Sequence, residues 1–102
     1  MSLLKEEEEE KNYITFTPQE IADAPASVDW RDQGIVNDIK DTGSCKSSYA
    51  FSTVGAIESA AAQRDGTLQQ FSEQQLVDCS SGVYWGNMRC YFGWPKNSYN
   101  YV

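Results

Sequence analysis

The clearest pattern of apolar and polar positions lies between residues 48 and 64. Apolar residues recur there mostly in steps of three and four, at Ala50, Phe51, Val54, Ile57 and Ala61. This spacing places them on one face of a helix. The sequence therefore predicts a helix from about Ser48 to Arg64. A hydroxyl of Ser47 or Ser48 is expected to cap its start, and Asp65-Gly66 is expected to end it.

Two shorter helices are predicted further along the chain. Ser72 and Gln75 have the spacing of a capping box, in which each side chain bonds the backbone N–H of the other residue. Pro95 favours the first position of another helix, which would run to Val102. Residues 12–27 have no clean period and are expected to be mostly coil, with a turn of helix at 18–22. The elements indicate a mainly α fold.

Composition changes this picture by excluding some partners. The 102 residues suit one small domain and carry 8 Lys+Arg against 15 Asp+Glu, a net charge of −7. Such a surface repels phosphate, so nucleic acid is not expected as a partner. No apolar run approaches the roughly 18 residues of a membrane span, and Met1–Leu4 is too short for a secretory signal. Residues 1–23, which include the acidic run Glu6–Glu10, are expected to be a largely disordered leader.

The chain contains no His, and this narrows the chemistry further. A Ser-His or Cys-His nucleophile pair cannot be built from these residues alone, nor can an H-E-x-x-H metal site. Three cysteines suggest one disulfide and an oxidising compartment, while the missing signal points the other way, so the location stays open. A metal site made of the three cysteines is the alternative, but their spacing does not favour it. We expect neither a metal nor a cofactor.

Four blocks, spread over residues 24–102, resemble the papain-like cysteine peptidases, in particular the cathepsin L-like branch. Residues 26–31 (ASVDWR) are similar to the mature N-terminus of that family. Residues 43–52 (GSCKSSYAFS) are similar to its active-site segment, Gly-Ser-Cys-Gly-Ser-Cys-Trp-Ala-Phe-Ser. Residues 71–80 (FSEQQLVDCS) resemble its Leu-Ser-Glu-Gln-Glu-Leu-Val-Asp-Cys segment, and residues 86–95 match its Gly-Cys-Asn-Gly-Gly-x-Pro region more loosely.

The resemblance implies half of a two-domain fold. Papain-like peptidases pair a helical left domain with a β-rich right domain, and the cleft lies between the two. Residues 24–102 correspond to the left domain, so the chain is expected to be truncated before the right domain. An apolar stripe of the long helix would then be exposed. Members of the family are usually lysosomal or extracellular.

The sequence departs from the family at the positions that carry catalysis. Ser48 occupies the place of the nucleophilic Cys, which the helix dipole and an imidazolium hold as a thiolate. A hydroxyl needs a base, and the family's His lies about 130–150 residues downstream, whereas this sequence ends at Val102. Thr42 replaces the Gln of the oxyanion hole, a loss that typically costs a factor of about 10²–10³ in rate. We expect both positions to be non-functional, with Ser48 acting as a helix cap.

Two other functions stay open. Gly93 resembles the residue whose backbone pairs with an extended peptide, and Trp94 and Pro95 resemble residues of a side-chain pocket, so the chain can be a peptide- or protein-binding pseudoenzyme. Trp94 is equally well explained as a surface aromatic. The third hypothesis is a residual serine-type hydrolase, in which Lys46 or a right domain supplied by another chain activates Ser48. The expected partners are therefore an extended peptide or a complementary domain.

The cysteines follow the family in part. The resemblance implies a disulfide between Cys45 and Cys90. Cys79 corresponds to one half of a second pair whose partner would lie beyond Val102, so Cys79 is expected to be unpaired.

Overall fold

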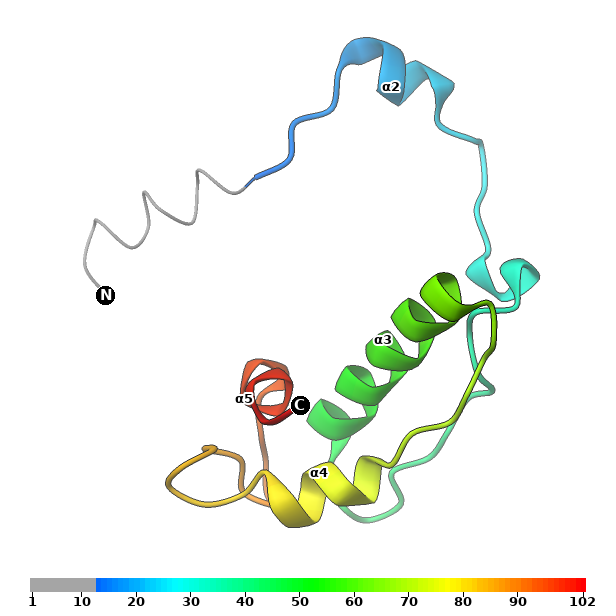
Figure 1. Cartoon of the computed structure of the whole chain (residues 1–102). Coiled ribbons are helices and arrows are strands. Elements are labelled where there is room, and N and C mark those ends of the chain that lie inside the picture. The colour runs from blue at the N-terminus through cyan, green and yellow to red at the C-terminus, as the bar shows by residue number, and fades with distance from the viewer. Residues whose placement is uncertain (1–12) are drawn as a thin grey trace, which may run out of the picture.

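The computed structural model describes residues 13–102 and consists of helices joined by loops (Figure 1). Their order is α2 (Pro18–Asp23), the 3₁₀ helix η1 (Trp30–Gln33), α3 (Ser48–Asp65), α4 (Glu73–Cys79) and α5 (Pro95–Tyr101). Residues 13–102 contain no extended strand, only isolated bridges between Ser81 and Asn87 and between Met88 and Phe92. The mainly α prediction is confirmed.

Helix α3 begins and ends where the sequence predicts, but the predicted hydroxyl cap at its start is absent. Gly66 follows it in the left-handed region at φ 75°, and its N–H bonds the carbonyl of Ala62. Ser47 is the N-cap residue, and its side chain makes no capping hydrogen bond. Ser48 is the first helical residue and not the cap. The prediction of a hydroxyl cap at this end is therefore wrong: the Ser47 side chain is buried and makes no capping bond, and Ser48 lies inside the helix.

The capping box predicted at α4 forms only by half. The Ser72 hydroxyl accepts the Gln75 N–H at 3.0 Å, but the Gln75 side chain does not return to Ser72. Its Nε2 donates instead to the Tyr101 hydroxyl of α5, at 3.2 Å. A complete box stands at α2, where Thr17 and Glu20 bond each other's backbone N–H. The tertiary partner on α5 has displaced a local bond.

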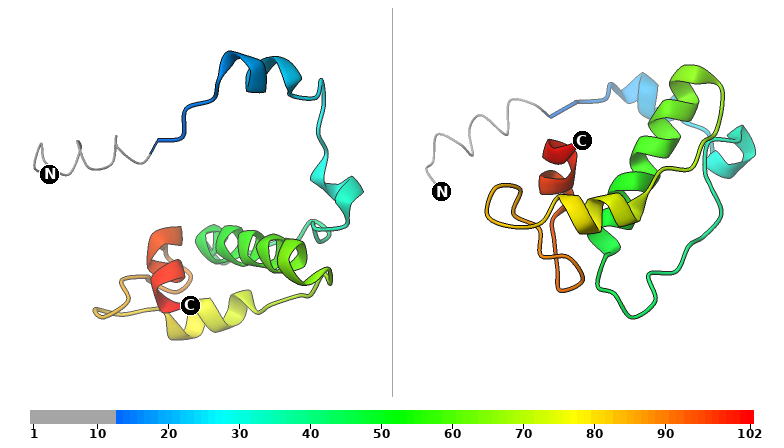
Figure 2. Two further views of the ribbon diagram at one scale, coloured as in Figure 1. Left: turned by 45° about the horizontal axis from the view of Figure 1, so that its top comes forward. Right: turned by 60° about the horizontal axis from the view of Figure 1, so that its bottom comes forward.

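The core lies where α4 and α5 pack against α3 (Figures 1 and 2). Its buried side chains are Tyr49, Ala50, Val54, Leu76 and Val77, with Cys45 and Tyr101 packed against them. Of the five positions on the predicted apolar face of α3, Ala50 and Val54 are buried, and the other three are half-buried. The phase of the helix is therefore predicted correctly.

One apolar face of α3 remains open. A groove of about 480 Å³ runs between α3, α4 and α5, with Val54, Ile57, Phe71 and Leu76 among its lining residues. Phe71 is 38% exposed there. Of the α3 side chains in this groove, Val54 is buried and Ile57 half-buried, so the exposed stripe that the half-fold is expected to leave is present only in part.

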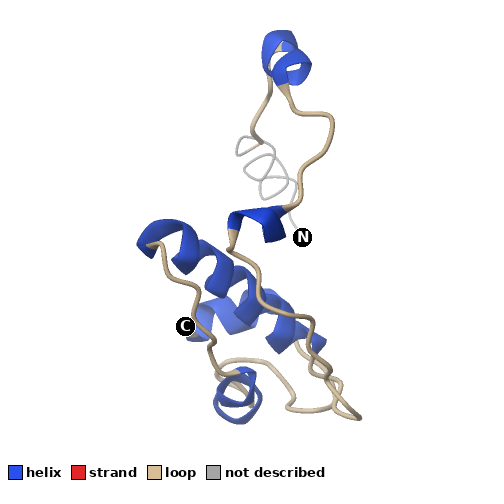
Figure 3. Cartoon of the chain, turned by 90° about the vertical axis from the view of Figure 1, so that its right-hand side faces the viewer, coloured by secondary structure: helices blue, strands red, loops and turns tan. Residues whose placement is uncertain are grey.

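The segment around α2 lies apart from the three-helix body, whereas residues 36–40 run beside α3 (Figures 1 and 3). Helix α2 is present where a turn of helix is predicted, and all of its residues are exposed. The acidic run at residues 6–10 lies outside the described residues. The boundary between a leader and the domain at residue 24 stays a prediction.

Candidate functional site

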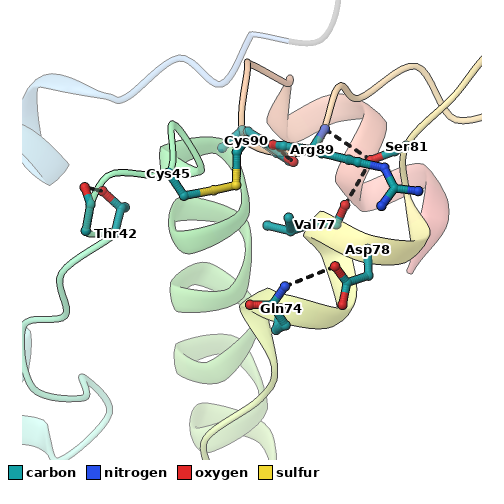
Figure 4. Close-up of a disulfide and its surroundings, with 10 residues drawn as sticks. Thr42, Cys45, Gln74, Val77, Asp78, Ser81, Arg89 and Cys90 are labelled. Atoms are coloured by element: carbon teal, nitrogen blue, oxygen red, sulfur yellow. Dashed lines mark hydrogen bonds between the residues drawn. A yellow bond between two sulfur atoms is a disulfide. The ribbon is translucent and has the colours of Figure 1, made fainter.

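A disulfide joins the two loops that carry the site positions. Cys45 and Cys90 are bonded, with their Cα atoms 4.6 Å apart (Figure 4). The N–H of Lys46 donates to the carbonyl of Cys90 at 3.0 Å. The pairing implied by the family resemblance is therefore present, and it ties the loop before Ser48 to the loop before Gly93. Cys79, the last residue of α4, carries an exposed free thiol.

Ser48 stands exposed at the N-terminus of α3. The helix dipole favours negative charge at this point. The hydroxyls of Ser52 and Thr53 donate to the Tyr49 carbonyl one turn earlier, at 3.1 and 2.7 Å. The Ser48 hydroxyl forms no hydrogen bond with any other residue in the range 13–102, and Lys46 is exposed. No base among residues 13–102 is therefore hydrogen-bonded to the Ser48 hydroxyl.

Thr42 belongs to a tight turn ahead of the disulfide (Figure 4). Its half-buried hydroxyl donates to the carbonyl of its neighbour Gly43 at the long distance of 3.5 Å. Gly43 adopts φ 63°, and its N–H bonds the Asp41 carboxylate at 2.7 Å. Local hydrogen bonds within residues 41–43 thus hold the loop, and none of them joins the Thr42 hydroxyl to Ser48.

Gly93 packs against two buried side chains. A Cβ atom at this position would lie 2.7 Å from the ring of Tyr49 and 2.8 Å from Oδ1 of Asn87. The Tyr49 ring is itself fixed, because its hydroxyl donates to the Arg89 carbonyl at 2.7 Å. Burial raises the pKa of Tyr49. Close approach, and not an unusual φ, is what requires glycine here.

We expect Gly93→Ala to lower the free energy of unfolding by about 1–3 kcal/mol, because neither neighbour has free space to move into. Gly55 of α3 is the matched control, since a Cβ there meets nothing within 4 Å. Gly55→Ala is expected to raise stability by about 0.5–1 kcal/mol, as a helix-interior Gly is replaced. Urea unfolding measures both. A Gly93→Ala variant as stable as the parent would contradict the packing described.

The side chain of Asn87 holds the Gly93–Pro95 segment in place through hydrogen bonds. Its fully buried side chain donates from Nδ2 to the hydroxyls of Ser80 (2.8 Å) and Ser98 (3.1 Å). Its Oδ1 accepts the N–H of Trp94 at 2.9 Å. The Asn87 side chain thus connects Ser80 after α4, Ser98 in the middle of α5 and the Gly93–Pro95 segment. The sequence analysis assigned it no role, because an Asn beside Gly86 has the composition of an ordinary turn.

The Gly93–Pro95 segment, which leads into α5, presents both backbone and aromatic surface. Gly93 is half-buried, and within residues 13–102 neither its N–H nor its carbonyl is hydrogen-bonded. Trp94 is 62% exposed, and Pro95 begins α5. The three residues expected to bind a peptide are consecutive, and the structure leaves one backbone donor and one acceptor of Gly93 free among residues 13–102.

A buried carboxylate, also missed by the sequence analysis, holds the loop that leads to Thr42. Glu58 of α3 is 2% exposed and accepts the Phe71 N–H at 2.8 Å. Lys40 lies 3.4 Å from Glu58 and also pairs with Glu73. The bond to Glu73 is the main cause of the raised pKa of Lys40. The only sequence signal for this cluster is a charged residue one position beyond the apolar face of α3.

Two negative findings limit the chemistry of the described part of the chain. Residues 13–102 contain no cluster of three or more His, Cys, Asp or Glu side chains arranged to hold a metal ion. Among the same residues, no helix has the length and apolar character needed to cross a membrane.

Comparison with known proteins gives one consistent result. The model of the papain family of cysteine proteases matches residues 24–102. The chain is 45% identical over 87 residues to digestive cysteine proteinase 1 of Homarus americanus, and 46% identical over 78 residues to the cathepsin L-like proteinase of Fasciola hepatica. It is 50% identical over 78 residues to pro-cathepsin H of Medicago truncatula.

These matches cover most of this chain but little of each relative. They span 85%, 76% and 76% of the chain, and 27%, 23% and 22% of the respective relatives. The chain therefore covers about a quarter of the length of the curated relatives that it matches. With the helical body, the disulfide and the matched segment in agreement, the chain belongs to the papain family of cysteine proteases.

Proposed function

We propose that residues 24–102 are a left domain of the papain type that does not cleave peptides by the thiolate chemistry of the family. The observation that carries this proposal is the exposed Ser48 hydroxyl at the start of α3, in the place of the family's Cys, with no base among the described residues bonded to it. The activity of any longer protein that contains these residues is a separate question.

The chemistry favours inactivity for these residues alone. A thiol with an ordinary pKa of about 8.5 ionises readily at a helix N-terminus. A hydroxyl is far less acidic and needs an adjacent base. A Ser–Lys pair requires a desolvated Lys in contact with the Ser, and Lys46 is exposed and not bonded to Ser48. The shorter side chain of Thr42 also leaves one oxyanion donor short of its usual reach.

A fluorogenic dipeptide assay tests this proposal directly. We expect the chain and its Ser48→Ala variant to hydrolyse the substrate at the same rate as buffer. A rate above buffer that Ser48→Ala abolishes would instead establish a serine-type hydrolase. Repeating the assay with a right domain supplied as a separate chain tests activation by a complementary domain.

A Ser48→Cys variant adds a second readout. We expect the new thiol, in a Cys79→Ser background, to react with iodoacetamide faster than Cys79 of the parent, because the α3 N-terminus stabilises a thiolate. The variant is still expected to cleave no peptide, since no imidazole is present among the 102 residues. Peptidase activity in this variant would show that a base has been overlooked.

A second function, peptide binding, is favoured by the Gly93–Pro95 segment. The free N–H and carbonyl of Gly93 suit pairing with an extended peptide, and the exposed Trp94 offers an apolar contact beside them. Titration with extended peptides, followed by Trp fluorescence, tests it with Trp94→Ala as the site variant. Absence of binding at millimolar peptide would rule this function out.

A further inference from the structure

The positively charged side chains of the described residues fall into two groups. Three are ion-paired with carboxylates: Arg31, Lys40 and Arg64. The other three form no ion pair within residues 13–102: Lys46, Arg89 and Lys96. Half of the described cations therefore remain unpaired although the chain has a net charge of −7, and their position is informative.

All three unpaired cations lie on segments next to the Gly93–Pro95 segment. Lys46 is bonded through its N–H to the Cys90 carbonyl, and Arg89 is the residue before Cys90 (Figure 4). Lys96 follows Pro95 in the first turn of α5. Each of the three is exposed. Arg89 thus precedes the Gly93–Pro95 segment and Lys96 follows it. Lys46 lies on the other loop, beside Cys45, which the disulfide joins to Cys90.

Acidic residues are missing from the same segment. Residues 79–102 contain Arg89 and Lys96 but no Asp or Glu. Asp78 directly precedes this segment, and Asp41 lies on the loop before Cys45. Asp41 accepts a hydrogen bond from the Gly43 N–H, and Asp78 accepts one from the Gln74 side chain. Exposed aromatic side chains lie in the same segment, among them Tyr91 at 77% and Trp94 at 62% exposed. The surface is therefore basic and aromatic on an otherwise acidic chain.

We propose that the Gly93–Pro95 segment binds extended peptides in which Asp or Glu alternates with apolar residues. This rests on the peptide-binding function proposed above. Pairing with the Gly93 backbone does not distinguish one peptide from another, whereas Lys46, Arg89 and Lys96 attract carboxylates. At about 0.15 M salt the screening length is roughly 8 Å, so these local charges act while the remote acidic residues are screened.

A single-stranded nucleic acid also uses cations and aromatic rings. The free backbone donor and acceptor of Gly93 match a peptide backbone better than a phosphodiester. Three cations also neutralise few phosphates, and nucleic-acid affinity depends on that number. The backbone of Gly93 and the small number of cations therefore both favour an acidic peptide over a nucleic acid.

Three matched octapeptides test the proposal. Valine alternates with Glu in the first, with Gln in the second and with Lys in the third, and the affinity of each for the whole chain is measured at 0.15 M salt. Because an exposed ion pair typically contributes a factor of about 1.4–5, we expect the Glu peptide to bind about tenfold more tightly than the Gln peptide. The Lys peptide should bind most weakly. At 0.5 M salt the preference should shrink.

Variants separate local from general electrostatics. Replacing Lys46, Arg89 and Lys96 together by Gln should remove the preference and leave the affinity for the Gln peptide unchanged. The matched control is Arg31→Gln with Arg64→Gln, which removes two ion-paired cations elsewhere and should keep the preference. Circular dichroism confirms that each variant is folded.

Each contrary outcome has a distinct meaning. Equal affinity for the three peptides would overturn the acidic preference and leave peptide binding intact. No binding of any peptide would overturn both. Loss of the preference in the control variant, or displacement of the Glu peptide by a short oligothymidylate at equal concentration, would also overturn the proposal, because binding would then respond to net charge or to any polyanion.

Discussion

Asn87→Ala is expected to lower the free energy of unfolding by about 3–5 kcal/mol. The amide makes three hydrogen bonds in a fully buried position, two to serine hydroxyls and one to the Trp94 N–H. Removing one partner from a buried polar group costs about 1–3 kcal/mol for each group left unsatisfied. A domain of this size has only about 5–15 kcal/mol of stability in total. The variant should therefore be close to unfolding at 37 °C.

One control variant separates the network from a general effect of the substitution. Asn100 is exposed near the end of α5, and Asn100→Ala should change stability by less than about 0.5 kcal/mol. Urea unfolding at 25 °C measures both variants. A loss below about 1 kcal/mol for Asn87→Ala would show that water replaces the amide without cost.

An Asn87→Asp variant adds a dependence on pH. Burial disfavours the charged carboxylate, so the pKa of this Asp would be raised in the folded state above its unfolded value of about 3.9. Relative to the parent, the variant should lose the least stability below that value. It should lose progressively more as the pH rises through the folded pKa. A stability difference that does not change between pH 4 and pH 7 would place this side chain in water.

Elements with local signals could be predicted from the sequence. The period of α3, its end at Gly66 and the start of α5 at Pro95 depend on residues close together in the chain, and the structure has all three. Gln75 shows where local reasoning fails. Its amide has two available partners, the Ser72 N–H and the Tyr101 hydroxyl, and packing of α5 decides for the second. Only the folded chain brings that second partner near.

The polar interior of the site could not be predicted for the same reason. Asn87 bonds residues 7 and 11 positions away, and Glu58 bonds residues 13 and 18 positions away. Neither spacing is a local motif. The family resemblance supplied the disulfide and the positions of Ser48 and Gly93, but not what Gly93 packs against. The reason for glycine at that position is the ring of Tyr49, which only the structure shows.

The double variant Cys45→Ser, Cys90→Ser is expected to lose about 4 kcal/mol of stability. The disulfide closes a loop of 45 residues, and in the chain-entropy model such a cross-link removes about that much conformational freedom from the unfolded chain. The connections that remain would be the Lys46–Cys90 backbone bond, the bond from the Tyr49 hydroxyl to the Arg89 carbonyl, and the packing of Gly93 on Tyr49. The Gly93–Pro95 segment should then separate more easily from the loop before α3, and peptide affinity should fall with stability.

Chemical reduction of the parent provides the matching experiment. Urea unfolding in dithiothreitol should reproduce the loss seen in the double variant, because both remove the same cross-link. Cys79→Ser, which alters an exposed free thiol, should change stability by less than about 0.5 kcal/mol. If reduction and the double variant both leave the unfolding midpoint unchanged, then packing and hydrogen bonds alone hold the Ser48 loop to the Gly93–Pro95 segment. In that case the chain would keep its fold and its peptide-binding surface in a reducing compartment as well as in an oxidising one.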